Sequence, residues 1–368
     1  MVGPTPILIG SQMLSGGGTE GQMVGLAKTL DPKRFEVHVI CFRRDAVVAD
    51  ALIAKGVQVF ELPVGSFVSL KNILHIWTLV QYLRKHQIRL FHAFDMPLAI
   101  FGAPVARFAG VPVVLSSIRG QRNLYSSGHE RLLQFSDRFV HGIVANASSL
   151  VDFLGARGTP REFTRLCQNG IDTRPYEEIQ RDLARPLTIG AVCVLRPEKN
   201  LELLMRAFSQ LTDRASLRLR ITGSGPMLES LKTLAVALRL ESDVLSFHPA
   251  TRDVPAALGE IDIFVSASFS EGLSNSIMEA LAAGCAVAAS AVGGNLELIQ
   301  DRATGLLFDP LRVETLTQAL RTLVDDAPLR IRIAESGREW IGSNFSMAAS
   351  ARTMGSIYDG YLLAAGQD

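Results

Sequence analysis

The sequence predicts an α/β protein built from two doubly wound parallel sheets, and three observations support this prediction. First, short β-branched runs alternate with helical patterns along almost the whole chain, which is typical of parallel strands joined by crossover helices. Second, the alternation restarts after Asn169-Gly170-Ile171-Asp172. Third, 368 residues exceed the usual size of a single domain.

The first half begins with an expected strand at residues 7–9, followed by a glycine loop (Gly16, Gly17, Gly18) that leads into a helix ended by Asp31-Pro32. Further strands are expected at residues 37–42, 57–62, 90–93, 111–116 and 140–145. Helical patterns fill the gaps, notably at 70–86 and 96–109.

The second half repeats this plan without repeating the sequence. Strands are expected at residues 187–194, 216–222, 244–247, 261–265, 285–289 and 305–308, and a last helix at 348–363. Ligands of open α/β sheets bind beyond the carboxyl ends of the strands. We therefore expect a domain boundary near residue 170 and a ligand site in a cleft between the two sheets.

The composition indicates a globular chain, with 48% hydrophobic and 20% charged residues. No apolar run reaches the ~18–20 residues of a membrane helix, and the N-terminus lacks the basic region of a signal peptide. The four cysteines are scattered without CxxC spacing. Neither a disulfide nor a zinc site is expected, and a reducing cytoplasm is the default compartment.

The net charge of +1 is unevenly distributed along the chain. Residues 1–170 carry 18 Lys and Arg against 11 Asp and Glu, whereas residues 171–368 carry 19 against 25. A basic half fits contact with anionic lipid or with an anionic acceptor, and it equally fits an ordinary surface. Nucleic acid is not an expected partner, because no basic stripe interleaved with aromatic residues is present.

The stretch 261–299 is the predicted functional centre. Its strand is followed by a loop holding Glu271 and by a helix over 275–283, with Ser274 as N-cap and Gly284 as its end. The backbone N–H groups expected to bind a diphosphate at this helix start belong to Gly272, Leu273, Ser274 and Asn275. Glu279 would accept the hydroxyls of a ribose, and Glu271 would face the group on the far phosphate. The alternative is two ordinary surface glutamates.

This stretch resembles the retaining family 4 glycosyltransferases of the GT-B fold. Glu271-Gly-Leu-Ser-Asn-Ser-Ile-Met-Glu279 is similar to their E-x7-E motif, and Val292-Gly293-Gly294-Asn295-Leu-Glu297 to their glycine-rich donor turn. The resemblance covers nearly the whole chain. It implies an acceptor-binding Rossmann-like domain (1–169), a nucleotide-sugar-binding one (170–345), and a C-terminal helix (346–368) that packs back on the first.

Lys199 and Arg196 are the cations expected to hold the diphosphate leaving group. The family usually has Gly-Arg-Leu upstream of this lysine, and this chain has Cys193-Val194-Leu195. Arg196 is therefore the candidate to replace the missing arginine. The alternative for both residues is a solvated pair at the start of a helix.

Three glycine or histidine motifs also match the family by position. The Gly16–Gly18 loop resembles the one that covers the donor phosphates, although a simple flexible loop is as common. Thr222-Gly223-Ser224-Gly225-Pro226 resembles the turn at the base of the donor pocket, with a structural turn as the favoured alternative. His248 follows a strand end where the family holds the nucleobase through backbone groups.

In the first half, two strand ends resemble those that reach the reacting sugar, and they carry His92 and Arg119. The family often has histidine where Phe94 and Arg119 stand. Arg119 cannot act as a base, but it could bind a phosphate of the donor or the acceptor. His92 has a core-facing role as its alternative.

The resemblance implies a retaining hexosyltransferase that moves a sugar from a UDP- or GDP-linked donor to the hydroxyl of a glycan or lipid-linked acceptor. The setting would be cell-envelope, exopolysaccharide or glycolipid biosynthesis, in the cytoplasm at the inner face of the membrane. The departing phosphate would take the acceptor proton, and neither a metal nor another cofactor is expected. Two alternatives stay open: a GT-B-fold sugar-nucleotide epimerase, and a non-catalytic regulatory subunit that binds a sugar nucleotide.

Overall fold

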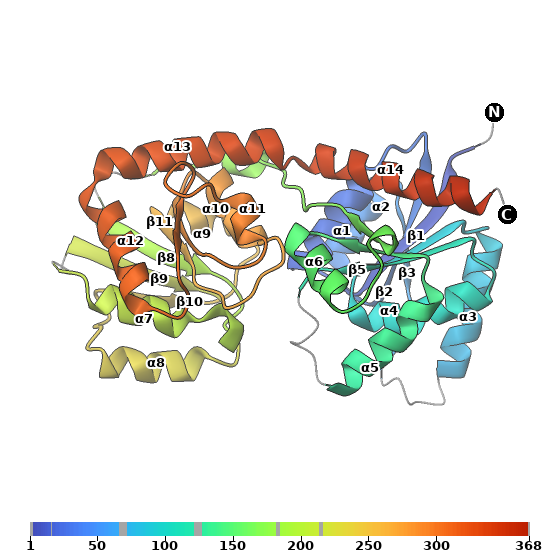
Figure 1. The fold of residues 1–368 in the computed structure, drawn as a ribbon, viewed down its shortest axis with the longest axis horizontal. Helices are drawn as coiled ribbons and strands as arrows, with labels where there is room; N and C mark the ends of the chain where they lie inside the picture. Colours follow the sequence, from blue (N-terminus) through green and yellow to red (C-terminus); the bar gives the residue numbers. More distant parts are fainter. Residues whose placement is uncertain are drawn as a thin grey trace. The chain divides into compact units, whose positions relative to one another are not determined.

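The computed structural model describes residues 3–15, 17–65, 72–120, 127–181, 185–212 and 216–366. The chain divides into two compact units, Met1–Gly170 with Met347–Asp368, and Ile171–Ser346. Each unit has its own all-parallel sheet (Figure 1), which confirms the two doubly wound sheets predicted from the sequence. None of the described helices combines the length and the hydropathy needed to cross a membrane.

The sheet of the first unit has the order β3-β2-β1-β4-β5-β6-β7. Its strands are β1 (Thr5–Leu14), β2 (Phe35–Arg44), β3 (Gln58–Glu61), β4 (Leu90–Ala93), β5 (Val113–Ile118), β6 (Gly142–Ala145) and β7 (Thr164–Leu166). Chain order reverses between β1 and β4, so the loops that leave these two strands diverge. Such a switch point opens a crevice at the carboxyl ends of the strands.

Helices cover both faces of this sheet (Figure 1). One face carries α1 (Gly18–Thr29), α2 (Ala46–Ile53) and α14 (Met347–Ala365), and the other carries α3 (Asn72–Lys85), α4 (Met96–Phe108) and α5 (Ser127–Ser136). The other described helices of this unit are η2 (Asp137–Phe139), α6 (Ser148–Ala156) and η3 (Arg161–Phe163). Ala351, Met354 and Tyr358 of α14 are buried in the core of this unit, although α14 follows the second unit in sequence.

The second unit has a sheet of order β10-β9-β8-β11-β12-β13. Its strands are β8 (Leu187–Val192), β9 (Leu217–Thr222), β10 (Leu245–His248), β11 (Ile263–Ser266), β12 (Ala286–Ser290) and β13 (Leu306–Phe308). Its helices are η4 (Arg174–Tyr176), η5 (Pro197–Lys199), α7 (Leu201–Ser209), α8 (Leu228–Ala237), α9 (Val254–Gly259), α10 (Asn275–Ala282), α11 (Asn295–Leu298), α12 (Val313–Asp325) and α13 (Ala327–Asn344). The switch point lies between β8 and β11.

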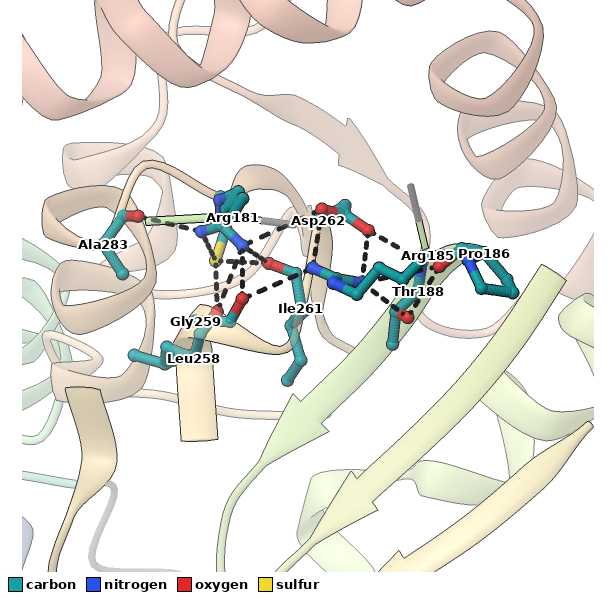
Figure 2. Close-up of polar contacts among 10 residues, drawn as sticks. Arg181, Arg185, Pro186, Thr188, Leu258, Gly259, Ile261, Asp262 and Ala283 are labelled. Carbon is teal, nitrogen blue, oxygen red and sulfur yellow. Dashed lines mark hydrogen bonds and ion pairs between the residues drawn. The ribbon is translucent and has the colours of Figure 1, made fainter. Parts of the chain in front are cut away.

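Two arginines anchor the segment before β8 to the body of the second unit (Figure 2). Arg181 donates to the carbonyls of Leu258, Gly259 and Ile261 through Nη1, and to Ala283 O through Nη2 at 2.8 Å. Leu258 and Gly259 end α9, Ile261 lies two residues beyond it, and Ala283 is the C-cap of α10. Carbonyls at a helix end have few intrahelical donors, and of these Leu258 O also accepts Ile261 N at 3.0 Å. Arg185 forms a bidentate ion pair with Asp262, in which both N–O distances are 2.9 Å.

Arg181→Met is expected to destabilise the protein by about 2–3 kcal/mol, because several buried carbonyls lose a charged donor at once. Thermal denaturation should show this as a lower Tm. Arg174→Met is the matched control, since Arg174 is exposed and pairs only with Asp172 within the described residues. Its effect should be small, and equal losses for the two variants would contradict this account of Arg181.

Most predicted elements lie where they were expected, although the bounds of several strands shift. Other differences concern β7, Lys199 and Pro226. The strand β7 was not predicted, because Thr-Arg-Leu is too short and too polar to be recognised as a buried run. Lys199 does not open α7: it ends the short η5, and the left-handed Asn200 (φ 51°) separates it from the helix. Pro226 lies in the turn before α8, which begins at Leu228.

Candidate functional site

Lys199 and Glu271 meet at the switch point of the second sheet, where the loops after β8 and β11 run side by side. The Lys199 Nζ lies 2.6 Å from Glu271 Oε1, and the Ser268 hydroxyl donates to the same oxygen at 2.7 Å. Phe269 N also donates to Glu198 O at 2.9 Å, which ties the two loops together. The loop residues predicted separately as a cation and an acid thus form one ion pair.

This ion pair is largely removed from water. The side chains of Lys199 and Glu271 are 24% and 14% exposed. Burial alone would lower the pKa of Lys199, but the charge and hydrogen bond of Glu271 outweigh it and leave the pKa raised. Lys199 is therefore a fixed cation at neutral pH, and its charge is available to an anion that enters beside Glu271.

The glycines of the Val292–Glu297 turn pack against the backbone of the Glu271 loop. A Cβ on Gly293 would come 2.1 Å from Glu271 O, and one on Gly294 would come 2.4 Å from Gly272 O. Gly293 also has φ +48°, which side chains rarely adopt. Only glycine allows this turn to lie against the backbone of Glu271 and Gly272, so the two motifs form one structure.

Gly223 and Gly225 likewise allow their turn to pack closely against the backbone of the loop that leads to Lys199. A Cβ on Gly223 would lie 1.8 Å from Cys193 O, and one on Gly225 would lie 2.4 Å from Leu195 O. This contact fits the structural-turn alternative for Gly223. His248 ends β10, accepts Gly223 N through its carbonyl, and lies 3.1 Å from Ser246 Oγ through its ring. Burial lowers the pKa of His248.

Glu279 lies in the second turn of α10 and is partly buried. Among the described residues, no hydrogen bond or ion pair to its carboxylate is present. Burial raises the pKa of Glu279 to about 7. Tyr176, from η4, is close enough for Glu279 to raise its pKa further above the value set by burial. No sequence pattern pointed to Tyr176, which lies 103 positions away from Glu279.

The start of α10 agrees with the prediction in position but not in capping. Ser274 is the N-cap, yet its hydroxyl makes no capping bond and instead lies 3.1 Å from Ser276 Oγ. Gly272, Leu273 and Ser274 are buried, and Asn275 begins the helix. Gly284 adopts φ +69° just beyond the last turn, as expected of a helix-ending glycine.

Arg196 does not touch the ion pair within the described structure. Its side chain is 60% exposed and lies 3.8 Å from Glu198. It lines a pocket beside the ion-paired loops, together with Pro197, Asn200, Met227 and Phe269. An exposed guanidinium at the edge of a pocket can swing towards a ligand, so the arrangement is compatible with the predicted phosphate contact.

The glycine loop of the first unit is described only from Gly17 onward, and Gly16 lies outside the described residues. Gly17 is the N-cap of α1, and Gly18 is its first residue. Glu20 stands in the first turn of the same helix. Its negative charge reduces the attraction of this helix start for a phosphate.

His92 is fully buried in the first unit. One ring nitrogen, Nδ1, lies 2.8 Å from the Tyr358 hydroxyl, and the other, Nε2, lies 2.9 Å from Ser117 Oγ. Burial, reinforced by Arg119, lowers the pKa of His92 well below its usual value. The geometry supports the core-facing alternative and gives no route for His92 to exchange a proton with a substrate.

Arg119 follows β5 and is held by residues that the sequence did not link to it. Its Nη1 donates to Asn169 Oδ1 at 2.8 Å, and its guanidinium lies 4.5 Å from the centre of the Phe94 ring. Asn146 donates to the same Asn169 oxygen at 3.3 Å.

Among the described residues, no group of three or more His, Cys, Asp or Glu side chains could hold a metal ion.

Comparison with known proteins identifies the family. The model of Glycosyltransferase Family 4 matches residues 16–174, and that of Glycosyl transferases group 1 matches residues 176–340. The chain is 29% identical over 283 residues to sulfoquinovosyl transferase SQD2 of Arabidopsis thaliana, covering 68% of this chain but only 52% of that protein. It is also 29% identical over 266 residues to the GDP-mannose-dependent alpha-(1-6)-phosphatidylinositol monomannoside mannosyltransferase of Mycobacterium tuberculosis, covering 67% and 69% of the two chains.

Solved structures show the same fold at lower identity. Anabaena HepE in complex with UDP and glucose superimposes with a TM-score of 0.83 at 20% identity, over 97% of this chain and 100% of that one. Sucrose-phosphate synthase of Thermosynechococcus elongatus gives 0.80 at 18% identity, over 98% and 100%. The predicted GT-B architecture is thus confirmed, and the chain belongs to the family 4 glycosyltransferases of the GT-B fold.

Proposed function

We propose that this protein is a retaining hexosyltransferase that moves a sugar from a nucleotide-diphosphate donor to a hydroxyl acceptor. The observation that carries the proposal is the ion pair of Lys199 with Glu271 beyond the carboxyl edge of the second sheet, in the loop that leads into α10. The same helix carries Glu279, whose carboxylate has no partner among the described residues. A cation, a helix start and two acids together suit a diphosphate flanked by a sugar and a ribose.

In this proposal, each group acts on a different part of the donor. The bond from the anomeric carbon to the β-phosphate oxygen breaks while the acceptor oxygen bonds to the same face of that carbon. Lys199, the first turn of α10 and Arg196 stabilise the charge that grows on the leaving diphosphate. Glu271 holds hydroxyls of the transferred sugar, and the acceptor proton passes to the departing phosphate. Lys199 supplies the positive charge, so no divalent metal is required.

The donor is proposed to be a UDP- or GDP-linked sugar. The HepE structure is a complex with UDP and glucose, and the name of the mycobacterial relative specifies GDP-mannose. Both the mycobacterial relative and the D-inositol 3-phosphate glycosyltransferase of Corynebacterium efficiens, 33% identical over 196 residues, are named for an anionic or lipid-linked acceptor. By analogy with these relatives, the acceptor of this protein is proposed to be a glycan or a lipid-linked molecule at the inner face of the cytoplasmic membrane.

The proposed transfer is tested by incubating the protein with labelled UDP-, GDP- and ADP-sugars and a lipid extract. Label should move from one donor into a lipid or glycan fraction, with release of the nucleoside diphosphate. An epimerised donor without transfer would instead identify a sugar-nucleotide epimerase. Binding of a sugar nucleotide that is never consumed would identify a regulatory subunit. Either of these two results would overturn the proposal.

Glu279→Gln is expected to weaken nucleoside diphosphate binding by about tenfold or more, because the variant loses a pair of charge-assisted hydrogen bonds to the ribose. The wild-type affinity should fall as pH drops through about 7, the pKa set by burial, because only the ionised carboxylate accepts two hydroxyls. Calorimetric titration at pH 6 and pH 8 measures both effects.

A 2′-deoxy nucleoside diphosphate serves as the control for Glu279. The wild type should bind it more weakly than the ribose form, and Glu279→Gln should discriminate little between the two. If the variant still prefers ribose as strongly as the wild type, Glu279 does not hold the ribose.

The membrane contact is proposed to involve α3 and α5, on one face of the first unit. In the first turns of α3, Ile73, Leu74 and Trp77 are exposed, Trp77 to 63%. Exposed Leu132 and Phe135 lie on α5, and Arg138 sits over the Phe135 ring. The last turn of α3 is basic, and its first turn holds no acid. Exposed aromatic and aliphatic side chains beside basic ones suit the surface of an anionic bilayer.

Trp77→Ser combined with Phe135→Ser is expected to reduce binding to phosphatidylglycerol-containing vesicles by about tenfold, since two large apolar groups no longer insert. Sedimentation with vesicles measures the bound fraction. Val236→Ser on α8 of the second unit is the control, because Val236 is an apolar side chain that is even more exposed, at 79%. An equal loss for the control, or none for the double variant, would rule out this surface.

A further inference from the structure

Arg119 is a largely buried cation that no described acid balances. No carboxylate of the described residues forms an ion pair with it, and its buried Nε has no hydrogen-bond partner there. Its described polar and ring contacts are the Asn169 oxygen and the face of Phe94. The residues just beyond it that the structure does not describe, 121–126, read Gln-Arg-Asn-Leu-Tyr-Ser and contain no acid.

The titratable groups around Arg119 are neutral. Burial and the Arg119 charge both lower the pKa of His92, while burial raises the pKa of Cys167 and of Tyr358. Burial lowers the pKa of Arg119 itself to about 10, so it stays protonated at neutral pH. A desolvated positive charge without a counter-charge is costly. Arg185, in contrast, is paired with Asp262.

We infer that Arg119 is a binding site for a phosphate group of a substrate, an inference that rests on the proposed transferase function. Asn169 and Phe94 hold the guanidinium in place, so little freedom is lost when an anion binds. Its Nε–H and Nη2–H groups can form the parallel bonds that phosphate oxygens accept. Its position just beyond the carboxyl end of β5 is where ligands of such sheets bind.

The phosphate that Arg119 binds can belong to the donor diphosphate or to a phosphorylated acceptor. Two titrations distinguish these two possibilities. The first compares UDP with uridine, whose affinity ratio reports contacts to the donor phosphates. The second follows Tm as inorganic phosphate is added in the presence of saturating UDP, against sodium chloride of equal ionic strength. Ligand binding to the native state raises Tm, so this arm reports an anion site that UDP leaves open.

The variants are Arg119→Met and Arg119→Lys. We expect Arg119→Met to fold with a Tm no lower than the wild type, because it removes an uncompensated buried charge. It should also lower the UDP-to-uridine affinity ratio by about tenfold or abolish the phosphate-induced Tm rise. Arg119→Lys should retain part of whichever response Arg119→Met loses.

Arg165→Met is the matched control, since Arg165 also lies over an aromatic ring, that of Tyr361, and donates to carbonyls in the same unit. Loss of the UDP preference would assign Arg119 to the donor, and loss of the phosphate response would assign it to the acceptor. Unchanged responses in both arms would overturn the inference. A wild-type protein that binds no nucleotide would refute the proposed function, but the phosphate titration would still test Arg119.

Discussion

Replacing Glu271 with glutamine is expected to lower kcat by about 10²–10³-fold while nucleoside diphosphate binding stays nearly unchanged. The carboxylate is proposed to hold hydroxyls of the sugar as charge develops in the transition state. Its loss also removes the counter-charge of Lys199, which frees that cation for the phosphates. The nucleotide affinity should therefore stay equal or rise slightly. Steady-state kinetics and calorimetry with the product nucleotide measure the two quantities.

Two further variants serve as comparisons for Glu271→Gln. Ser268→Ala removes one hydrogen bond to Glu271 and should have a milder effect of about tenfold on kcat, because the ion pair persists. Glu229→Gln is the matched control, since Glu229 pairs with Lys232 on the exposed surface of α8. Full activity in Glu271→Gln would place Glu271 away from the reacting sugar.

Lys199→Met is expected to reduce kcat/KM by about 10³-fold and to weaken nucleoside diphosphate binding by tenfold or more. The methionine fills a similar volume but cannot stabilise the charge on the leaving phosphate. The affinity for the free nucleoside should barely change, because Lys199 is proposed to contact phosphate only. Removal of the cation also leaves the carboxylate of Glu271 without its ion-pair partner.

Comparison of nucleoside and nucleoside diphosphate binding separates this role from a general loss of structure. Lys199→Arg should recover part of the activity, and Lys232→Met should behave like the wild type. If Lys199→Met weakened nucleoside and nucleoside diphosphate binding equally, its effect would be on the fold of the loop and not on the phosphates.

The fold could be predicted because each strand carries its own local pattern. β4 occupies Leu90–Ala93 and α10 begins at Asn275, both as expected. These elements are buried apolar runs or helices with clear start and stop residues, so nearby sequence determines them. β7 escaped prediction because its place in the sheet depends on pairing with β6, and three residues hold no pattern of their own.

The sequence named candidate residues for the site, but it could not predict the contacts among them. The Lys199–Glu271 ion pair joins positions 72 residues apart, and the glycine contacts of Gly293 with Glu271 depend on how two loops pack. The burial of His92 against Tyr358, 266 positions away, is likewise a tertiary effect. The sequence therefore identified Arg119 as a departure from the family, and only the structure showed its charge to be uncompensated among the described residues.

The most direct test of the account is a melting-temperature screen of the wild type and the double variant Lys199→Met/Glu279→Gln with UDP, GDP and ADP. Binding to the native state should raise the wild-type Tm with at least one nucleoside diphosphate, in proportion to the logarithm of its concentration. The double variant should show no such rise. A wild type that none of the three stabilises, or a double variant that responds as the wild type does, would contradict a nucleotide-sugar site at Lys199, Glu271 and Glu279.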